Sequence, residues 1–202
     1  MLPGDLQARG AGASACRPIF SQLLTVAALL LSGCVRPQPL AVLGQVPAFQ
    51  LISQTGQPFD SKSLDGHIWV ADFIYTTCTG PCPMMSAHMR QVQNTTVETP
   101  DLRLVSITVD PAHDTPAVLA EYAKHFKQDP ARWFFLTGDQ ARLNDLGVNG
   151  FKLNSVDGSL THSTRFVLVD RQRRIRGYYI AGEDAFMPKL LHDIRQLERE
   201  PS

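Results

Sequence analysis

Two nearly continuous apolar runs are the main feature of the hydrophobic and polar pattern along the chain. The first covers His67 to Tyr75 and the second Leu102 to Val109, and such runs are typical of strands buried on both faces. Pro81 and Pro83 lie between them and are tolerated only in the first turn of a helix, so a helix is expected to begin between about Thr79 and Pro83. This strand, helix, strand order predicts a right-handed crossover between two parallel strands.

Shorter patterns complete the expected fold. Thr115 and Pro116 form a good start for a helix over PAVLAEYAKHF, and apolar residues at helical spacing predict an amphipathic helix from about Met187 to Leu197. The other expected elements are strands at Phe49–Ile52 and Trp133–Leu136, a short helix at Gln140–Leu146, and a hairpin of Arg165–Val169 with Ile175–Ile180. The predicted fold class is α/β and thioredoxin-like, with a central mixed sheet flanked by helices and an insertion from about Pro111 to Leu160 between the two halves.

The first 34 residues are interpreted as a lipoprotein-type signal segment. An uncharged apolar run from Pro18 to Leu31 follows Arg9 and Arg17, and its length suits a signal peptide better than the roughly 20 residues of a membrane span. The run ends in Leu-Ser-Gly-Cys, which resembles the bacterial lipobox, so Cys34 is expected to be lipidated and to anchor the protein. An uncleaved N-terminal helix is the alternative. The expected location is the periplasmic face of a bacterial membrane.

The rest of the chain is expected to form a tether and one domain. Residues 35–45 contain two prolines and no periodic pattern, which is typical of a tether, and the domain is expected to cover residues 46–200. Lysine plus arginine (19) equals aspartate plus glutamate (19), so charge alone does not favour binding to nucleic acid. Recognition of a partner must therefore depend on a specific site.

Cysteine usage indicates where that site lies. Of four cysteines, Cys16 falls in the leader and Cys34 is assigned to the lipid, which leaves Cys78 and Cys82 in the domain. A cysteine at a helix N-terminus experiences the positive end of the helix dipole, so the pKa of Cys78 is expected to be lowered. The i, i+4 spacing places both sulfurs on one helix face, close enough to share a metal or to form a disulfide.

His162 is the best candidate for a third ligand. It lies just before the expected hairpin, in the loop that faces the active-site helix of a thioredoxin fold. Two soft sulfurs and an imidazole suit copper in either oxidation state, Cu(I) or Cu(II), whereas zinc usually takes a fourth protein ligand.

Three segments together resemble the Sco (SenC) family, the copper chaperones of cytochrome c oxidase assembly. These segments are YTTCTGPCPMM (Tyr75–Met85), VDPAHDTP (Val109–Pro116) and THSTRFVLVD (Thr161–Asp170), and the resemblance covers about residues 46–200. It implies that Cys78, Cys82 and His162 bind copper and that Asp110 tunes the site or its docking. Arg173 and Arg174 depart from the family pattern, because many relatives carry glycine in that turn.

The resemblance also implies a partner and a role. The protein would deliver copper to the binuclear copper site of oxidase subunit II, or keep the cysteines of that site reduced. Other periplasmic copper chaperones and thioredoxin-like reductants are further expected partners. We expect a metal chaperone in the first place, with thiol-disulfide reductase activity left open.

The alternative function is that of an extracytoplasmic thiol-disulfide oxidoreductase using Cys78 and Cys82. Asp72 stands six residues before Cys78, where thioredoxins keep a buried carboxylate that relays protons to the pair. Such enzymes also place a proline directly before the hairpin, and the segment LTHST has none.

Several other residues have simpler interpretations. Met84, Met85 and Met89 are expected to fill the core. His88, His113 and His125 are expected to be solvated or capping residues, and Arg171, Arg173, Arg174 and Arg176 to form a solvated hairpin, with a docking patch as the alternative.

Overall fold

Strand β4 (Ile68–Ile74) is the centre of the structure, and all seven of its side chains are buried, as its apolar run predicts. The computed structural model describes residues 38–153 and 163–200. β4 pairs in parallel with β5 (Leu102–Thr108) from Ile68 opposite Leu102 to Ile74 opposite Thr108. On its other side it pairs antiparallel with β7 (Arg165–Val169), so the predicted parallel crossover and the mixed sheet are both confirmed.

The described residues form one eight-stranded sheet in the order β1-β8-β7-β4-β5-β6-β2-β3. Its remaining strands are β1 (Gly44–Gln45), β2 (Gln50–Ser53), β3 (Pro58–Asp60), β6 (Trp133–Thr137) and β8 (Arg174–Ile180). β7 and β8 form the predicted hairpin, and β6 extends the parallel half of the sheet next to β5.

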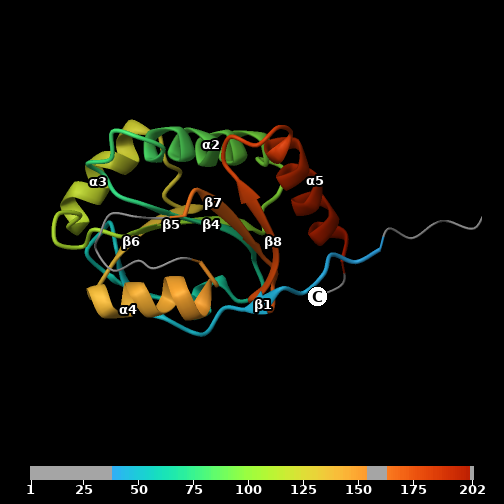
Figure 1. Ribbon diagram of the computed structural model, residues 1–202, viewed down its shortest axis with the longest axis horizontal. Coiled ribbons are helices and arrows are strands. Elements are labelled where there is room, and N and C mark those ends of the chain that lie inside the picture. The colour runs from blue at the N-terminus through green and yellow to red at the C-terminus, as the bar shows by residue number, and fades with distance from the viewer. Residues whose placement is uncertain (1–37, 154–162, 201–202) are drawn as a thin grey trace, which may run out of the picture. The chain divides into compact units, whose positions relative to one another are not determined.

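Helices cover both faces of this sheet (Figure 1). The helices are α2 (Cys82–Thr95), α3 (Pro116–His125), α4 (Gln140–Asp145) and α5 (Phe186–Arg199), with a 3₁₀ turn at Ser61–Leu64 and a π-helical turn at Leu146–Gly150. Apolar residues of α2, α3 and α5 share one buried cluster, and those of α4 belong to a second. Helices α3, α4 and α5 begin within one residue of their predicted starts, and the start of α2 falls inside its predicted range.

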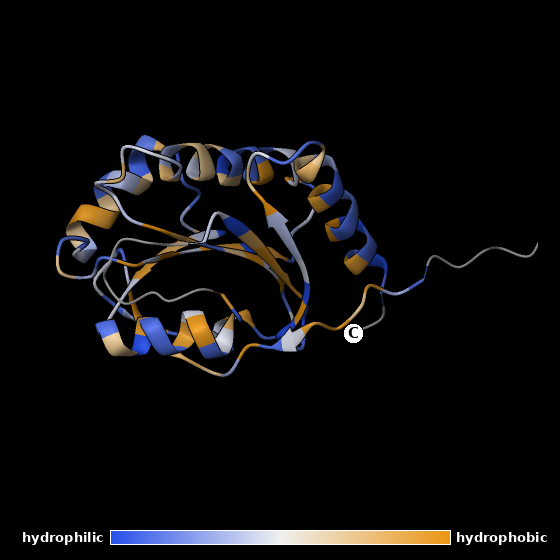
Figure 2. Cartoon of the chain, in the orientation of Figure 1, coloured by the Kyte–Doolittle hydropathy of each residue, from blue (hydrophilic) through white to orange (hydrophobic). Residues whose placement is uncertain are grey.

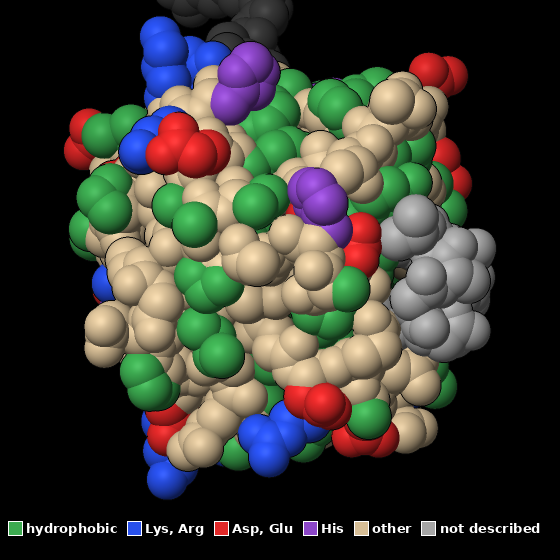
Figure 3. Space-filling model, turned by 90° about the vertical axis from the view of Figure 1, so that its left-hand side faces the viewer, with side chains coloured by type: hydrophobic (Ala, Val, Ile, Leu, Met, Phe, Trp, Pro, Cys, Tyr) green, Lys and Arg blue, Asp and Glu red, His purple; other side chains and the backbone are tan. Residues whose placement is uncertain are grey.

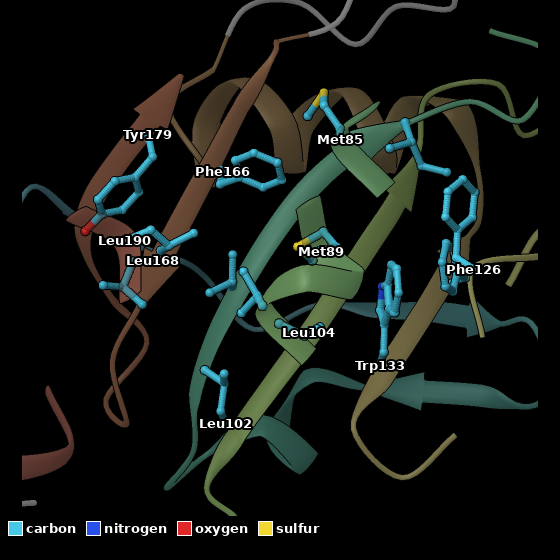
Figure 4. Packing of buried hydrophobic residues seen from close by; sticks show 14 of the residues in the cluster. Met85, Met89, Leu102, Leu104, Phe126, Trp133, Phe166, Leu168, Tyr179 and Leu190 are labelled. Atoms are coloured by element: carbon cyan, nitrogen blue, oxygen red, sulfur yellow. The ribbon is translucent and has the colours of Figure 1, made fainter. Parts of the chain in front are cut away.

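Alternation along β4 assigns its side chains to the two clusters. Ile68, Val70 and Ile74 pack with the methionines of α2, whereas Trp69 and Phe73 pack on the α4 side. Figure 4 shows the first cluster, in which Met89 and Leu104 lie between the helix and the sheet. Figure 2 shows that hydrophobic residues concentrate in the strands and on the sheet-facing sides of the helices. Close packing against the sheet therefore fixes the position of α2.

The N-terminal part of the domain differs from the expectation. Gly44 and Gln45 pair antiparallel with β8, and the carbonyl of Leu40 accepts hydrogen bonds from Arg176. These contacts mean that the folded part of the chain begins before residue 46 and includes the second half of the expected tether. The signal segment and Cys34 lie outside the described residues.

Within the described ranges, none of the helices has both the length and the apolar character that crossing a membrane requires. The short edge strands β1 and β3 and the π-helical turn are elements that the sequence pattern did not predict.

Candidate metal centre

The two cysteines lie where β4 leads into α2. Cys82 is the first residue of the helix and is fully buried, and Cys78, in the preceding loop, is 7% exposed. Both are thiols and not a disulfide. Pro81 and Pro83 cannot donate a backbone hydrogen bond and are accepted in a first turn, which explains why the helix begins here. Only Cys82 lies at the positive end of the helix dipole. Cys78 precedes the helix by four residues, so the expectation that both sulfurs share one helix face is wrong, and the loop rather than the helix brings Cys78 to Cys82.

Hydrogen bonds make the two thiols unequal. Burial tends to raise the pKa of Cys78, but the backbone N–H and the thiol of Cys82, the N–H of Gly80 and the Tyr75 hydroxyl all donate to its sulfur, and the net shift of its pKa is downward. Burial is also the largest influence on Cys82, and there it prevails and raises the pKa of that thiol strongly. Cys78 is therefore the sulfur suited to act first as a thiolate, with Cys82 kept protonated behind it.

A buried carboxyl lies beneath the pair. Asp72 is fully buried in β4, and the Ser106 hydroxyl donates to its Oδ1 at 2.6 Å while Trp133 Nε1 donates to Ser106 at 3.0 Å. Its Oδ2 has no hydrogen-bond partner in the part of the chain that the structure describes. Burial raises the pKa of Asp72 to about 7, and the Ser106 hydrogen bond opposes this only partly. The carboxyl expected at this spacing is therefore present and can carry a proton near neutral pH.

A second buried carboxylate was not identified from the sequence. Asp114 has no exposed surface and accepts hydrogen bonds from the N–H of Thr76 at 3.1 Å and from the hydroxyls of Thr76 and Thr108 at 2.5 Å. His113 Nδ1 lies 3.2 Å from its Oδ1. The signal available in the sequence was an aspartate in VDPAHDTP, directly after a buried strand and before the start of α3.

Asp110 lies at the edge of this group. It is half-buried, its N–H donates to Thr108 Oγ1 at 2.9 Å, and its charge contributes to raising the pKa of Tyr75, although the hydrogen bond with Cys78 is the largest cause of that shift. Its carbonyl accepts from the N–H groups of His113 and Asp114. The charge of Asp110 therefore acts on Tyr75, which hydrogen-bonds to Cys78. Among the described residues, Asp110 does not form a close group with both cysteines.

His162, the expected third ligand, lies outside the described residues. Within residues 38–153 and 163–200, no three histidine, cysteine or acidic side chains gather closely enough to hold a metal ion. The described residues thus supply two sulfurs of a soft-metal site, and this donor set suits copper better than a hard cation.

The methionines of α2 and His88 differ in their burial and contacts. Met85 and Met89 are buried in the core as expected, whereas Met84 is 46% exposed in the first turn of α2. His88 packs against two aromatic rings, those of Phe166 and Phe186, and is not simply solvated.

The arginine cluster is not a solvated hairpin, and that expectation is wrong. Arg176 is 5% exposed and pairs with Asp170 and Glu200, and the other three arginines, Arg171, Arg173 and Arg174, each pair with an acid of this chain. Their charges are therefore engaged inside the domain.

A cavity in the described residues lies away from the cysteines. It has a volume of about 460 Å³, is lined by Phe49, Lys62, Arg142 and their neighbours, and contains neither cysteine. The face shown in Figure 3 carries scattered charges of both signs and no continuous charged patch. Neither feature competes with the cysteine pair as the site of chemistry.

Comparison with known proteins gives a consistent result. The SCO1/SenC family model matches residues 41–197. The SCO1 protein homolog of Bacillus subtilis is 31% identical over 157 residues, which cover 75% of this chain and 81% of that protein.

Solved structures agree in fold. BsSco, described as a Sco family cytochrome c oxidase assembly protein with a disulfide switch, matches at a TM-score of 0.72 and 29% identity, covering 82% of this chain and 100% of that one. Copper-bound ScoI of Bradyrhizobium japonicum matches at a TM-score of 0.62 and 25% identity, covering 76% and 99%. The predicted thioredoxin-like fold is confirmed.

Proposed function

Because this chain belongs to the SCO1/SenC family, we propose that it binds copper through Cys78 and Cys82 and acts in cytochrome c oxidase assembly. The observation that carries the proposal is the reduced cysteine pair at the start of α2, with one thiol of lowered pKa. In the finer form of the proposal, copper passes to the binuclear site of oxidase subunit II, or the cysteines of that site are reduced by this pair.

Copper is the cargo in this account. Two thiols lose their protons when the metal binds, and the low pKa of Cys78 means that its proton leaves most easily. His162 would complete the set of ligands as the imidazole. A partner's thiolates then displace the protein's ligands one at a time, so the metal is handed over without being released into solution.

Asp110 would tune this exchange. Its negative charge is close enough to influence Tyr75, which hydrogen-bonds to Cys78. A negative charge near the thiols favours their protonated form, or a bound cation, over free thiolates.

The proposed location is the periplasmic face of a bacterial membrane, with Cys34 carrying the lipid. The apolar run before Leu-Ser-Gly-Cys supports this proposal. Other periplasmic copper chaperones and thioredoxin-like reductants would supply the metal and the electrons.

Thiol-disulfide exchange is the second candidate function, and Asp72 favours it. The Cys78 thiolate would attack a partner disulfide and form a mixed disulfide, and Cys82 would then attack Cys78 and release the partner as a dithiol. Cys82 must lose a proton in the second step, and a carboxyl with a pKa of about 7 beneath the pair is suited to accept it.

Anaerobic copper titration separates the two functions. We expect wild type to bind one copper per chain, Cys78→Ser and Cys82→Ser to lose tight binding, and His162→Ala to bind more weakly with its fold intact. His125→Ala removes an exposed histidine of α3 and is the matched control, expected to bind as wild type does. Undiminished affinity in both cysteine variants would refute the copper proposal and leave dithiol exchange.

A further inference from the structure

Asp114 joins two segments that are 38 residues apart in the sequence. It is buried in the loop between β5 and α3, and its own N–H donates to the Asp110 carbonyl at 2.8 Å. Its carboxylate accepts from Thr108 at the end of β5 and from Thr76 in the loop that leads to Cys78. A carboxylate removed from water must have its lone pairs satisfied, and here neutral donors of the chain do so.

Thr76 is the residue through which Asp114 reaches the thiols. Both donors of Thr76 are used, the N–H at 3.1 Å to Oδ2 and the hydroxyl at 2.5 Å to Oδ1. Thr76 follows β4 by two residues and precedes Cys78 by two, so these bonds fix the direction in which the loop leaves the sheet. Hydrogen bonds to a charged acceptor are roughly twice as strong as neutral ones.

We propose that Asp114 is a positioning residue that holds the Cys78 loop, through Thr76, in the geometry in which the sulfurs of Cys78 and Cys82 meet. The hydrogen bonds around Cys78 depend on that geometry, because Gly80 and Tyr75 donate to its sulfur from the same loop. The inference rests on the proposed function in one respect, namely what the paired sulfurs are used for.

Asp114 does not act as a ligand. Both of its oxygens are occupied by Thr76, Thr108 and His113, and in the described residues it forms no metal-sized group with the cysteines. His113 is held by the same carboxylate, with Nδ1 also 3.4 Å from Thr76 Oγ1. The contacts of Asp114 therefore connect it to the thiols through Thr76 and the loop that leads to Cys78.

The test compares Thr76→Val with Thr76→Ser in the purified full-length chain. Valine keeps the shape but loses the hydroxyl, and serine keeps the hydroxyl. We expect Thr76→Val to change the alkylation rate of Cys78, followed by peptide mass spectrometry, by about tenfold, as loss of one charge-assisted hydrogen bond implies, and to weaken copper binding. Thr76→Ser is expected to stay within about twofold of wild type, as it preserves that bond.

Thr96→Val is the matched control. Thr96 lies at the other end of α2, is equally a threonine with side-chain hydrogen bonds, and donates to Val92 O at 2.7 Å. It is expected to lower the melting temperature and to leave the Cys78 alkylation rate unchanged. Asp114→Asn is the second variant, expected to alter that rate in the same direction as Thr76→Val.

The outcomes are distinguishable from failure of the proposed function. If Thr76→Val and Asp114→Asn alkylate at the wild-type rate, or shift it no more than Thr96→Val, the positioning role is refuted even if copper binds. If wild type binds no copper but the two variants still change Cys78 reactivity, the positioning role stands and the copper proposal does not.

Discussion

The acidic side chains at the two ends of the central strands find different kinds of partner. At the amino ends of β4 and β5, the acids Asp65, Asp101, Asp170 and Glu200 are each paired with an arginine. At the carboxyl ends and on the floor beneath α2, Asp114 and Asp72 accept hydrogen bonds from hydroxyls. Among the described residues, the hydrogen-bond partners of these two acids include no lysine or arginine.

This difference distinguishes residues that stabilise the fold from residues that support chemistry. Arg176 is bonded to Asp170, Glu200 and the carbonyl of Leu40, so it ties β8 to α5 and to the start of the domain. Asp72 keeps one oxygen without a partner among the described residues, and the raised pKa makes it a proton carrier. A buried carboxyl without a cation is costly to a fold, and such groups are found preferentially at functional sites.

The largest expected effect on stability is at the amino end. Arg176→Met leaves Asp170 and Glu200 without their shared partner, and breaking a buried ion pair from one side costs about 3–5 kcal/mol. Denaturant unfolding measures this loss, and Cys78 alkylation should not change. Lys124→Met removes an ion pair with Glu121 that is more than 70% exposed on both sides and should cost about 0–1 kcal/mol. Equal losses of unfolding free energy in Arg176→Met and Lys124→Met would contradict the claim that the ion pairs of Arg176 stabilise the fold.

Asp72→Asn should produce the next largest effect, and its sign depends on pH. The native pKa of about 7 exceeds the unfolded value of 3.8, so the native state binds more protons in that interval and the free energy of unfolding falls as pH rises from about 4 to about 7. Relative to wild type, the variant should gain up to about 4 kcal/mol between pH 4 and pH 8.

Unfolding curves at several pH values measure the difference between wild type and Asp72→Asn. A difference that does not depend on pH would show that Asp72 titrates normally. The thiol chemistry provides a separate readout, because the variant should slow the second step of disulfide exchange while leaving copper affinity nearly unchanged.

Ser106→Ala should have an intermediate effect. It removes the hydroxyl that donates to Asp72 and accepts from Trp133, and leaving buried polar groups unpaired costs about 1–3 kcal/mol. Because this hydrogen bond lowers the pKa of Asp72, its loss should move the pH dependence to higher pH. In an Asp72→Asn background the upward shift should disappear, and its persistence would assign the pH dependence to another group.

The smallest effect is expected in the hairpin turn. Arg173 has a φ of 62°, the left-handed region that favours glycine. Arg173→Gly relieves about 1 kcal/mol of strain but loses a partly exposed ion pair with Asp65, so the net change in unfolding free energy should be within about 1 kcal/mol. A loss of several kcal/mol would mean that this pair contributes as Arg176 does.

The sequence predicts those features that local chemistry determines. The apolar runs place β4 and β5, and the prolines place the start of α2 and with it the two cysteines, because each signal acts within a few residues. The edge strands β1 and β3 have two and three residues and no pattern of their own, so pairing with distant strands alone defines them.

The contacts of Asp114 could not be predicted for a similar reason. Its partner Thr76 is 38 residues away, and only the parallel pairing of β4 with β5 brings their carboxyl ends together. Likewise, the sequence predicts solvated arginines in the hairpin, since only Asp170 among the acids that pair with them is local. The other three acids come from distant segments and are Asp65, Asp101 and Glu200.

The central claim is that both sulfurs at the start of α2 hold copper, and X-ray absorption at the copper edge tests it most directly. The copper-loaded full-length chain, prepared without oxygen, should show two sulfur neighbours per copper in wild type and one in the weaker complex that Cys78→Ser forms at high protein concentration. A shell of only nitrogen and oxygen in wild type, or the same sulfur count in the variant, would contradict the account.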